Sequence, residues 1–184
     1  AAIEGHWETN RDHGMPLLLF ALPNMETESN DFEVGIPNLG SLILTHSLEG
    51  QVTGLKDFAA EDRPNALIVF WSFRVMVGLG MLMVLLSLTA LWLRKKGSLY
   101  ESSWFHKFAL IMGPTGYIAL LAGWVTTEVG RQPWVVYGVI RTKDGLSHTV
   151  TADQVGLSLI IFVLVYTVVF GAGIYYMLRL IKLG

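Results

Sequence analysis

The chain has 184 residues, of which 52% are hydrophobic and only 15% charged, with a formal net charge of −2 and a mean hydropathy of +0.48. This balance is too apolar for an ordinary soluble domain of this length, so we expect a membrane protein. Cysteine is absent, which excludes a disulfide framework, a thiolate metal site and a cofactor attached through a cysteine pair. The opening residues, Ala1-Ala2-Ile3-Glu4, show neither an initiator methionine nor a signal peptide, so we expect a piece of a longer protein.

Residues 1–65 are acidic and rich in turn-forming residues, with eleven Asp and Glu against three Arg and Lys. Two apolar patches in this segment run from Leu17 to Leu22 and from Leu39 to Leu44. Both are too short to cross a bilayer, so they predict buried strands or short helices, or surfaces that pack on the membrane-facing body. We therefore expect residues 1–65 to form an extramembrane loop domain.

Three later stretches are apolar for the roughly 20 residues that a membrane-spanning helix needs; they cover about 66–93, 108–127 and 155–178. The predicted fold is an all-α integral membrane protein, in which residues 66–184 supply three transmembrane helices. Gln132-Pro133 should end the second helix, because the residue before a proline avoids the helical region.

Basic residues set the expected orientation. They lie between the first two spans and after the third: Arg94, Lys95, Lys96, Lys107, Arg179 and Lys182. The positive-inside rule places these loops and the C-terminus in the cytoplasm. Residues 1–65 and the loop 128–154 are then expected on the outer side.

Arg74 lies about two turns into the first predicted span, where an unpaired cation would cost several kcal/mol. It either snorkels to the outer surface or binds an acidic group, for example on a cofactor. Met76, two residues later, is either an adaptable packing residue or an axial ligand to iron. Spacing alone does not decide between these alternatives.

Glu128 closes the second span, with Trp124 one helical turn before it and Arg131 one turn after it. These residues predict either an Arg–Glu ion pair at a helix end or a cofactor site with a carboxylate ligand and a stacked indole. Glu4 lies in the acidic segment, where an exposed carboxylate is usually solvated, and it needs a partner to act as a proton acceptor. No histidine falls within a predicted span, which excludes a bis-histidine haem bundle built by this chain alone.

Three separate segments resemble subunit I of the bacterial cytochrome bd-type ubiquinol oxidases. Ala1 to Glu4 resembles the start of the quinol-binding loop, Phe73 to Val77 the low-spin haem segment, and Gly123 to Trp134 the signature block. The segment from Gly138 to Thr142 resembles the cyanide-insensitive branch of this family. The loop lysine of the family and at least its first four spans are not part of this chain.

The resemblance implies a role for each matching residue. Met76 would be an axial ligand of the low-spin haem b, and Arg74 would tune that haem. Glu128 would ligate the iron of the high-spin haem b, and Trp124 would lie between the high-spin haems. Glu4 would accept a hydrogen bond or a proton at the quinol site. The remaining implied cofactor-binding residues are Arg131, Gln132 and Trp134.

The resemblance also implies the function, that of a terminal oxidase of the respiratory chain. Ubiquinol or menaquinol would be oxidised at the periplasmic side of the bacterial inner membrane, and electrons would pass through b-type haems to a centre with haem d or a third haem b. That centre would reduce O2 to water. The expected partners are the N-terminal part of subunit I, subunit II, membrane lipid and, optionally, a small accessory subunit; nucleic acid is not expected.

Two alternatives remain open on the residues themselves. In the first, the chain is a non-redox transporter or assembly module, and Arg74, Glu128 and Arg131 form only interhelical ion pairs. In the second, it is the haem b membrane anchor of a quinone-linked dehydrogenase.

Overall fold

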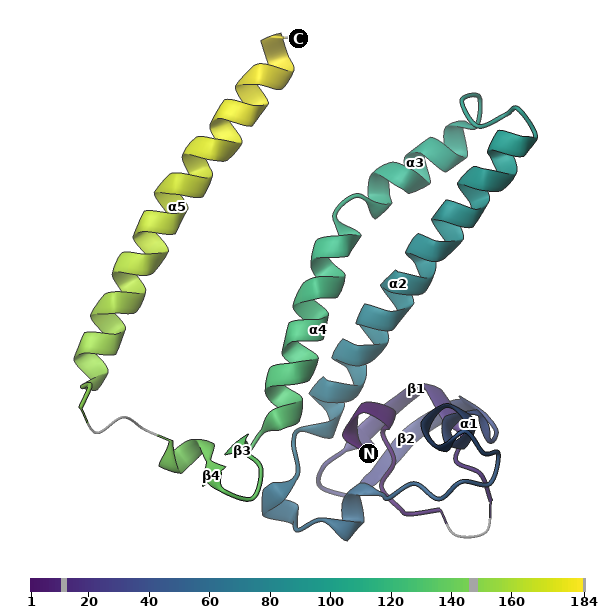
Figure 1. Ribbon diagram of the computed structural model, residues 1–184, viewed down its shortest axis with the longest axis vertical. Coiled ribbons are helices and arrows are strands. Elements are labelled where there is room, and N and C mark those ends of the chain that lie inside the picture. The colour runs from purple at the N-terminus through teal and green to yellow at the C-terminus, as the bar shows by residue number, and fades with distance from the viewer. Residues whose placement is uncertain (11–12, 146–148, 184) are drawn as a thin grey trace. The chain divides into compact units, whose positions relative to one another are not determined.

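The computed structural model describes residues 1–10, 13–145 and 149–183 (Figure 1). It consists of two compact units, Ala1–Thr142 and the residues from Lys143 onward. Each unit is considered by itself below.

Within the described residues, three helical stretches are long and apolar enough to cross a membrane: Ala60–Lys95, Ser103–Arg131 and Ala152–Leu183. This confirms the prediction of a mostly helical chain with three membrane-spanning segments.

Helix α2 (Ala66–Lys95) forms the first span. Asn65 caps its start, because the side-chain oxygen accepts a hydrogen bond from the backbone N–H of Ile68. Basic residues close its last turn, where they interact favourably with the helix dipole. The Nζ of Lys96 lies 3.9 Å from the centroid of the Trp92 ring, which anchors this end of the helix.

The second span consists of two helices, α3 (Ser103–Met112) and α4 (Thr115–Arg131), interrupted at Gly113-Pro114. Pro114 has no N–H with which to continue the helical hydrogen bonds. At the interruption the Thr115 hydroxyl donates to the carbonyl of Met112 at 2.6 Å. The helical region is longer than the predicted 108–127 and contains a break that hydropathy does not reveal. Its end at Arg131, just before Gln132-Pro133, is as predicted.

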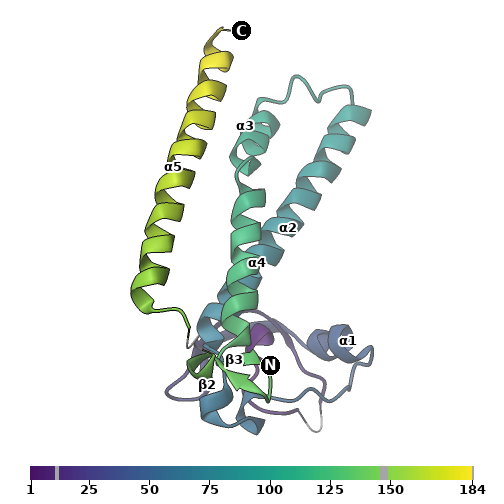
Figure 2. The ribbon, with the colours of Figure 1, turned by 60° about the vertical axis from the view of Figure 1, so that its left-hand side comes forward.

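Helices α2 and α4 lie side by side and run antiparallel (Figures 1 and 2). Across this contact the Ser72 Oγ and Thr126 Oγ1 atoms share a hydrogen bond of 2.8 Å. The Thr126 hydroxyl also lies 2.9 Å from the carbonyl of Ala122, so it stays within hydrogen-bonding distance of its own helix. The two helices are therefore joined by polar contacts as well as by packing, as is common within membranes.

Residues 1–65, called the outer segment below after their predicted side of the membrane, contain a two-stranded antiparallel sheet of β1 (Leu17–Asn24) and β2 (Ser29–Ile36), followed by the short helix α1 (Leu39–Thr45). The two apolar patches therefore form a strand and a short helix, as predicted. Three single turns of 3₁₀ helix complete the segment: η1 (Ala2–Glu4), η2 (Leu55–Asp57) and η3 (Ala60–Asp62).

The core of the outer segment is shared with the first turns of α2. Leu18 and Ala21 of β1 are buried against Phe70, and Trp7 and Leu55 are buried against the start of the helix. Phe70 has no exposed surface. The segment consequently needs α2 to complete its core, and this fixes its N-terminal turn against the helix.

After α4 the chain forms a small hairpin of β3 (Trp134–Val136) and β4 (Ile140–Arg141), followed by the turn η4 (Thr142–Asp144). In the second unit, helix α5 (Ala152–Leu183) forms the third span. Three aromatic rings at i, i+4 spacing contact one another along α5, with centroids 4.2 and 5.6 Å apart; they belong to Phe162, Tyr166 and Phe170.

Candidate functional site

Glu4 and Arg74 form an ion pair between the N-terminal turn and helix α2. The Nη2 of Arg74 lies 3.0 Å from the Oε2 of Glu4, and only 12% of each side chain is exposed. The Nε of Arg74 donates to the carbonyl of Leu18 at 2.8 Å, and its guanidinium lies 4.5 Å from the centroid of the Phe70 ring. Arg74 is thus paired rather than snorkelling, and its anionic partner is the predicted quinol-site residue.

Gly5 holds the backbone that follows Glu4. Its φ of +68° lies in the left-handed region that favours glycine. A methyl group at this Cα would also lie 3.0 Å from Cδ2 of Phe70. The Nδ2 of Asn30 in β2 donates to the carbonyl of Gly5 at 2.6 Å. The backbone beside Glu4 is therefore held between β2 and α2.

His6, two residues after Glu4, is also buried. Its Nε2 lies 2.9 Å from the carbonyl of Pro16. Burial lowers the pKa of His6, and the hydrogen bond to Pro16 and the negative charge of Glu4 only partly oppose this. The folded segment therefore favours the neutral form of the His6 imidazole over the protonated form.

Met76 lies in the contact between α2 and α4. A methyl group built at Gly123 would lie 2.8 Å from the Sδ of Met76, so the sulfur rests directly on the glycine backbone of α4. On α2, a methyl group at Gly78 or Gly80 would meet no atom of the described residues within 4 Å. Gly80, one turn after Met76, and Gly78, on the opposite side of the helix from Met76, therefore each border space that the described residues do not fill.

Trp124, Glu128 and Arg131 are all exposed on α4. The Trp124 side chain is the largest of them and is 62% exposed. In the part of the chain that the structure describes, no ion pair joins Glu128 to Arg131, and no side-chain hydrogen bond is made by Glu128. The alternative of a closed Arg–Glu pair at this helix end is therefore not what the structure contains.

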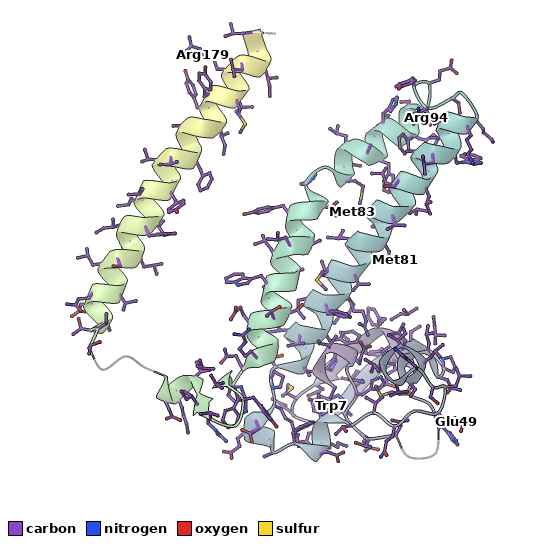
Figure 3. The ribbon with its side chains drawn as sticks, in the orientation of Figure 1. Trp7, Glu49, Met81, Met83, Arg94 and Arg179 are labelled. Carbon is purple, nitrogen blue, oxygen red and sulfur yellow. The ribbon has the colours of Figure 1, made fainter. Side chains whose placement is uncertain are left out.

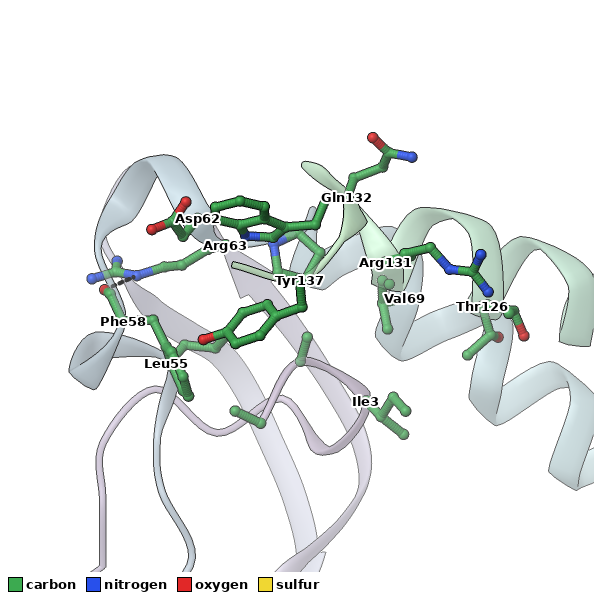
Figure 4. Close-up of a pocket in the computed structure, with 16 residues that line it drawn as sticks. Ile3, Leu55, Phe58, Asp62, Arg63, Val69, Thr126, Arg131, Gln132 and Tyr137 are labelled. Atoms are coloured by element: carbon green, nitrogen blue, oxygen red, sulfur yellow. Dashed lines mark hydrogen bonds between the residues drawn. The ribbon is translucent and has the colours of Figure 1, made fainter. Parts of the chain in front are cut away.

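A cavity of about 480 Å³ opens where the N-terminal turn, the loop before α2, the end of α4 and the β3–β4 hairpin meet (Figure 4). Apolar side chains such as Ile3 and Leu55 line it, together with three predicted cofactor-binding residues, Arg131, Gln132 and Trp134. The predicted site residues thus fall into three groups. Glu4 pairs with Arg74, Met76 lies between α2 and α4 while Trp124 and Glu128 are exposed on α4, and the remaining three residues line this cavity.

Trp134 connects the hairpin to the outer segment. The Arg141 guanidinium lies 5.0 Å from the centroid of the Trp134 ring and pairs with Asp62 at 2.8 Å and Glu61 at 3.4 Å. The Nε1 of Trp134 is buried, with no hydrogen-bond partner among the residues described. Such an indole N–H can donate to an acceptor that is not part of this unit.

Three residues outside the predicted set position the site, namely Gly5, Phe70 and Gly123. Gly5 directly follows Glu4, and a glycine beside a functional residue is a usable signal for a special backbone conformation. Gly123 belongs to a regular series of glycines that is visible in the sequence. No local pattern distinguishes Phe70 from the other apolar residues of its span.

The family model of cytochrome bd terminal oxidase subunit I matches residues 1–184. Over its whole length the chain is 34% identical to cytochrome bd ubiquinol oxidase subunit 1 of Bacillus subtilis (strain 168), and covers 41% of that protein. It is 30% identical to cytochrome bd-II ubiquinol oxidase subunit 1 of Escherichia coli (strain K12), again over its whole length, and covers 48% of it.

Among solved structures, the bd oxidase of Geobacillus thermodenitrificans contains a similar chain, with a TM-score of 0.75 and 32% identity. The match covers 99% of this chain and 41% of that one. The chain thus spans less than half the length of these relatives. The match along every residue shows that the chain belongs to the cytochrome bd terminal oxidase subunit I family.

Proposed function

We propose that this chain provides part of the quinol site and half of a haem-binding framework in a bacterial terminal quinol oxidase that reduces O2 to water. The observation that carries the proposal is the Glu4–Arg74 pair. It joins the predicted proton acceptor to the helix that also bears Met76, two residues from Arg74. Membership of the family weighs against a transporter, an assembly module or a dehydrogenase anchor.

Glu4 is arranged to accept a proton from a quinol hydroxyl. Arg74 engages Oε2, which leaves Oε1 as the acceptor for the substrate. The guanidinium offsets the negative charge of the carboxylate in a mostly covered site. Each quinol releases two protons and two electrons: Glu4 takes one proton at Oε1, the other proton passes to water outside the site, and the two electrons leave for the redox centres of the complete oxidase. The class of substrate is ubiquinol or menaquinol.

The described residues fit haem binding. Glu128 has no ion-pair partner among the described residues, and its carboxylate near the end of a largely apolar helix suits a metal cation. The exposed indole of Trp124 can stack on a flat ring, and the open space at Gly80, one turn from Met76, leaves room for one. Met76 offers a thioether, which is a recognised axial donor to haem iron.

In this proposal Met76 holds a low-spin haem b, and Glu128 holds a high-spin haem b. When bound, these haems and a third of type d or b supply the iron that carries electrons and binds oxygen. Arg131, Gln132 and Trp134 contribute polar groups around the cavity at the end of α4.

We further propose that the outer segment and the hairpin lie on the periplasmic side of the bacterial inner membrane. Arg94 is at the far end of α2 from the outer segment (Figure 3), and with Lys95 and Lys96 it forms a basic cluster that favours the cytoplasm. The C-terminus would then also be cytoplasmic. Completion of the enzyme requires the N-terminal part of subunit I and a subunit II.

The test of the haem assignment is a reduced-minus-oxidised absorbance spectrum of the complete oxidase carrying Met76→Leu. We expect loss of the low-spin haem b signal. Met81→Leu is the matched control, because Met81 is exposed on the side of α2 away from α4 (Figure 3). An unchanged low-spin signal in Met76→Leu would contradict the assignment.

The test of the quinol site is Glu4→Gln, for which we expect roughly a 100-fold lower rate of quinol oxidation, since a positioned proton acceptor contributes about that much or more. The haem spectrum should stay intact. Glu8→Gln is the control, because the Glu8 side chain is largely exposed four residues away. Equal rates in the two variants would argue against Glu4 as the acceptor.

A further inference from the structure

Three glycines of α4 face α2 at intervals of seven residues: Gly116, Gly123 and Gly130. Their nearest neighbours on α2 are also seven residues apart: Met83, Met76 and Val69. Because the helices are antiparallel, the two series run in opposite directions and meet pair by pair. We call this contact the glycine seam. A seven-residue period keeps one face of a helix on its partner over several turns.

Glycines in such a contact let two membrane helices approach closely, because they place no side chain between the backbones. Figure 3 shows Met83 on the side of α2 that faces α4, in agreement with its place in the seam. The seam therefore accounts for the close approach of the two helices. This spacing of glycines explains helix packing and is not evidence for a haem site.

The three contacts of the seam are not equivalent. A methyl group at Gly116 would lie 3.8 Å from the Cε of Met83, and one at Gly130 would lie 3.7 Å from the Cγ1 of Val69. Both are ordinary van der Waals distances. A methyl group at Gly123 would lie 2.8 Å from the Sδ of Met76, which no stable contact allows. An added methyl group therefore fits at the two ends of the seam as it stands, whereas at its centre the flexible Met76 side chain would have to move.

We infer that Gly123 is a positioning residue that sets where the sulfur of Met76 lies, and through it the ligation of the low-spin haem. This inference rests on the proposed role of Met76. The thioether side chain is flexible, so its sulfur is held by what it touches and not by its own rotamers. A Cβ atom built at Gly123 would have the Sδ of Met76 as its nearest neighbour, so the sulfur lies against the α4 backbone at this glycine. Any side chain at Gly123 must displace the sulfur, because the backbone that carries that side chain is fixed by the helix.

Gly123→Ala in the complete oxidase tests the inference, with Gly116→Ala and Gly130→Ala as matched controls. All three substitutions add one methyl group to the same face of the same helix. We expect loss of intensity or a shift of the low-spin haem b band, and a lower midpoint potential of that haem, only in Gly123→Ala. The direction follows because thioether ligation raises the potential of a haem, and a displaced sulfur removes that effect.

The outcomes separate this inference from the proposed function. If Met76→Leu abolishes the low-spin signal while Gly123→Ala leaves both spectrum and potential as in the wild type, the inference is wrong and the ligand assignment stands. If Met76→Leu leaves the signal unchanged, the ligand assignment fails and the inference fails with it. Equal changes in all three alanine variants would show a general packing effect and would also overturn the inference.

Should Gly123→Ala not assemble, it is combined with Thr126→Ser, which removes one methyl group from a buried side chain one turn away and keeps the hydroxyl that bonds to Ser72. The same spectral and potentiometric comparison then applies to the double variant against Thr126→Ser alone.

Discussion

The ion pair between Glu4 and Arg74 predicts a large effect from a small substitution. Glu4→Gln preserves the size of the side chain and removes only its charge, which leaves the mostly covered guanidinium of Arg74 without a counter-ion. Breaking a buried pair from one side costs about 3–5 kcal/mol, and the 12% exposure of both side chains places this pair near the lower end. A cost of about 3 kcal/mol corresponds to roughly a 150-fold larger equilibrium constant for local opening.

Native-state hydrogen exchange of the complete oxidase, followed by mass spectrometry of peptides from residues 1–36, measures this opening. The matched control is Glu8→Gln. Glu8 pairs with Lys56 at the same distance of 3.0 Å, but the two side chains are 79% and 37% exposed. A surface pair of this kind is worth about 0–1 kcal/mol, so exchange should rise by about fivefold at most.

A double-mutant cycle completes the experiment. Arg74→Met also loses the hydrogen bond to the carbonyl of Leu18, so it should destabilise the segment by itself. Glu4→Gln should add little in that background, because the charge it would leave unpaired is already gone. Additive effects in the double variant, or equal effects of Glu4→Gln and Glu8→Gln, would refute the claim that this pair holds the outer segment on α2.

Three further substitutions probe the same region. Gly5→Ala should loosen the N-terminal turn and slow quinol oxidation, because it combines an unfavourable backbone conformation with a clash against Phe70; wild-type exchange and turnover would count against this. Phe70→Ala should destabilise the docking of the outer segment by about 3–5 kcal/mol, measured by proteolysis or exchange, whereas Phe32→Ala, at a side chain that is 79% exposed, should have little effect. Because burial lowers the pKa of His6, the folded segment should lose stability as the pH falls below about 6.5 and be unaffected by this group above it. His6→Gln should flatten that pH dependence, and an equally steep dependence without His6 would assign it to other groups.

The membrane spans could be predicted from the sequence because long apolar runs have few alternative structures. The end of α4 at Gln132-Pro133 could also be predicted, because the residue before a proline avoids the helical region. The break at Gly113-Pro114 was not foreseen, since hydropathy is insensitive to a missing backbone N–H within an apolar run.

The contacts of the site were harder to predict. The predicted depth of Arg74 in the membrane left two alternatives, snorkelling to the surface or an acidic partner. Local patterns could not identify that partner as Glu4, which lies 70 residues earlier in the chain. The partnership depends on the fold of the outer segment, where Phe70 completes the core that holds Glu4 in place. Conversely, the regular spacing of the glycines in α4 was visible in the sequence, but its partner series on α2 becomes meaningful only once the two helices are known to be antiparallel neighbours.

The shared core of the outer segment also bears on biosynthesis. Residues 1–65 leave the ribosome before α2, yet Phe70 and Ala66, which they need for burial, belong to α2. The outer segment therefore cannot reach its final structure until the helix has been made and inserted. Insertion of α2 and folding of the outer segment are therefore a single ordered event, and a substitution that removes the Phe70 ring would stop the segment from folding before any cofactor is bound.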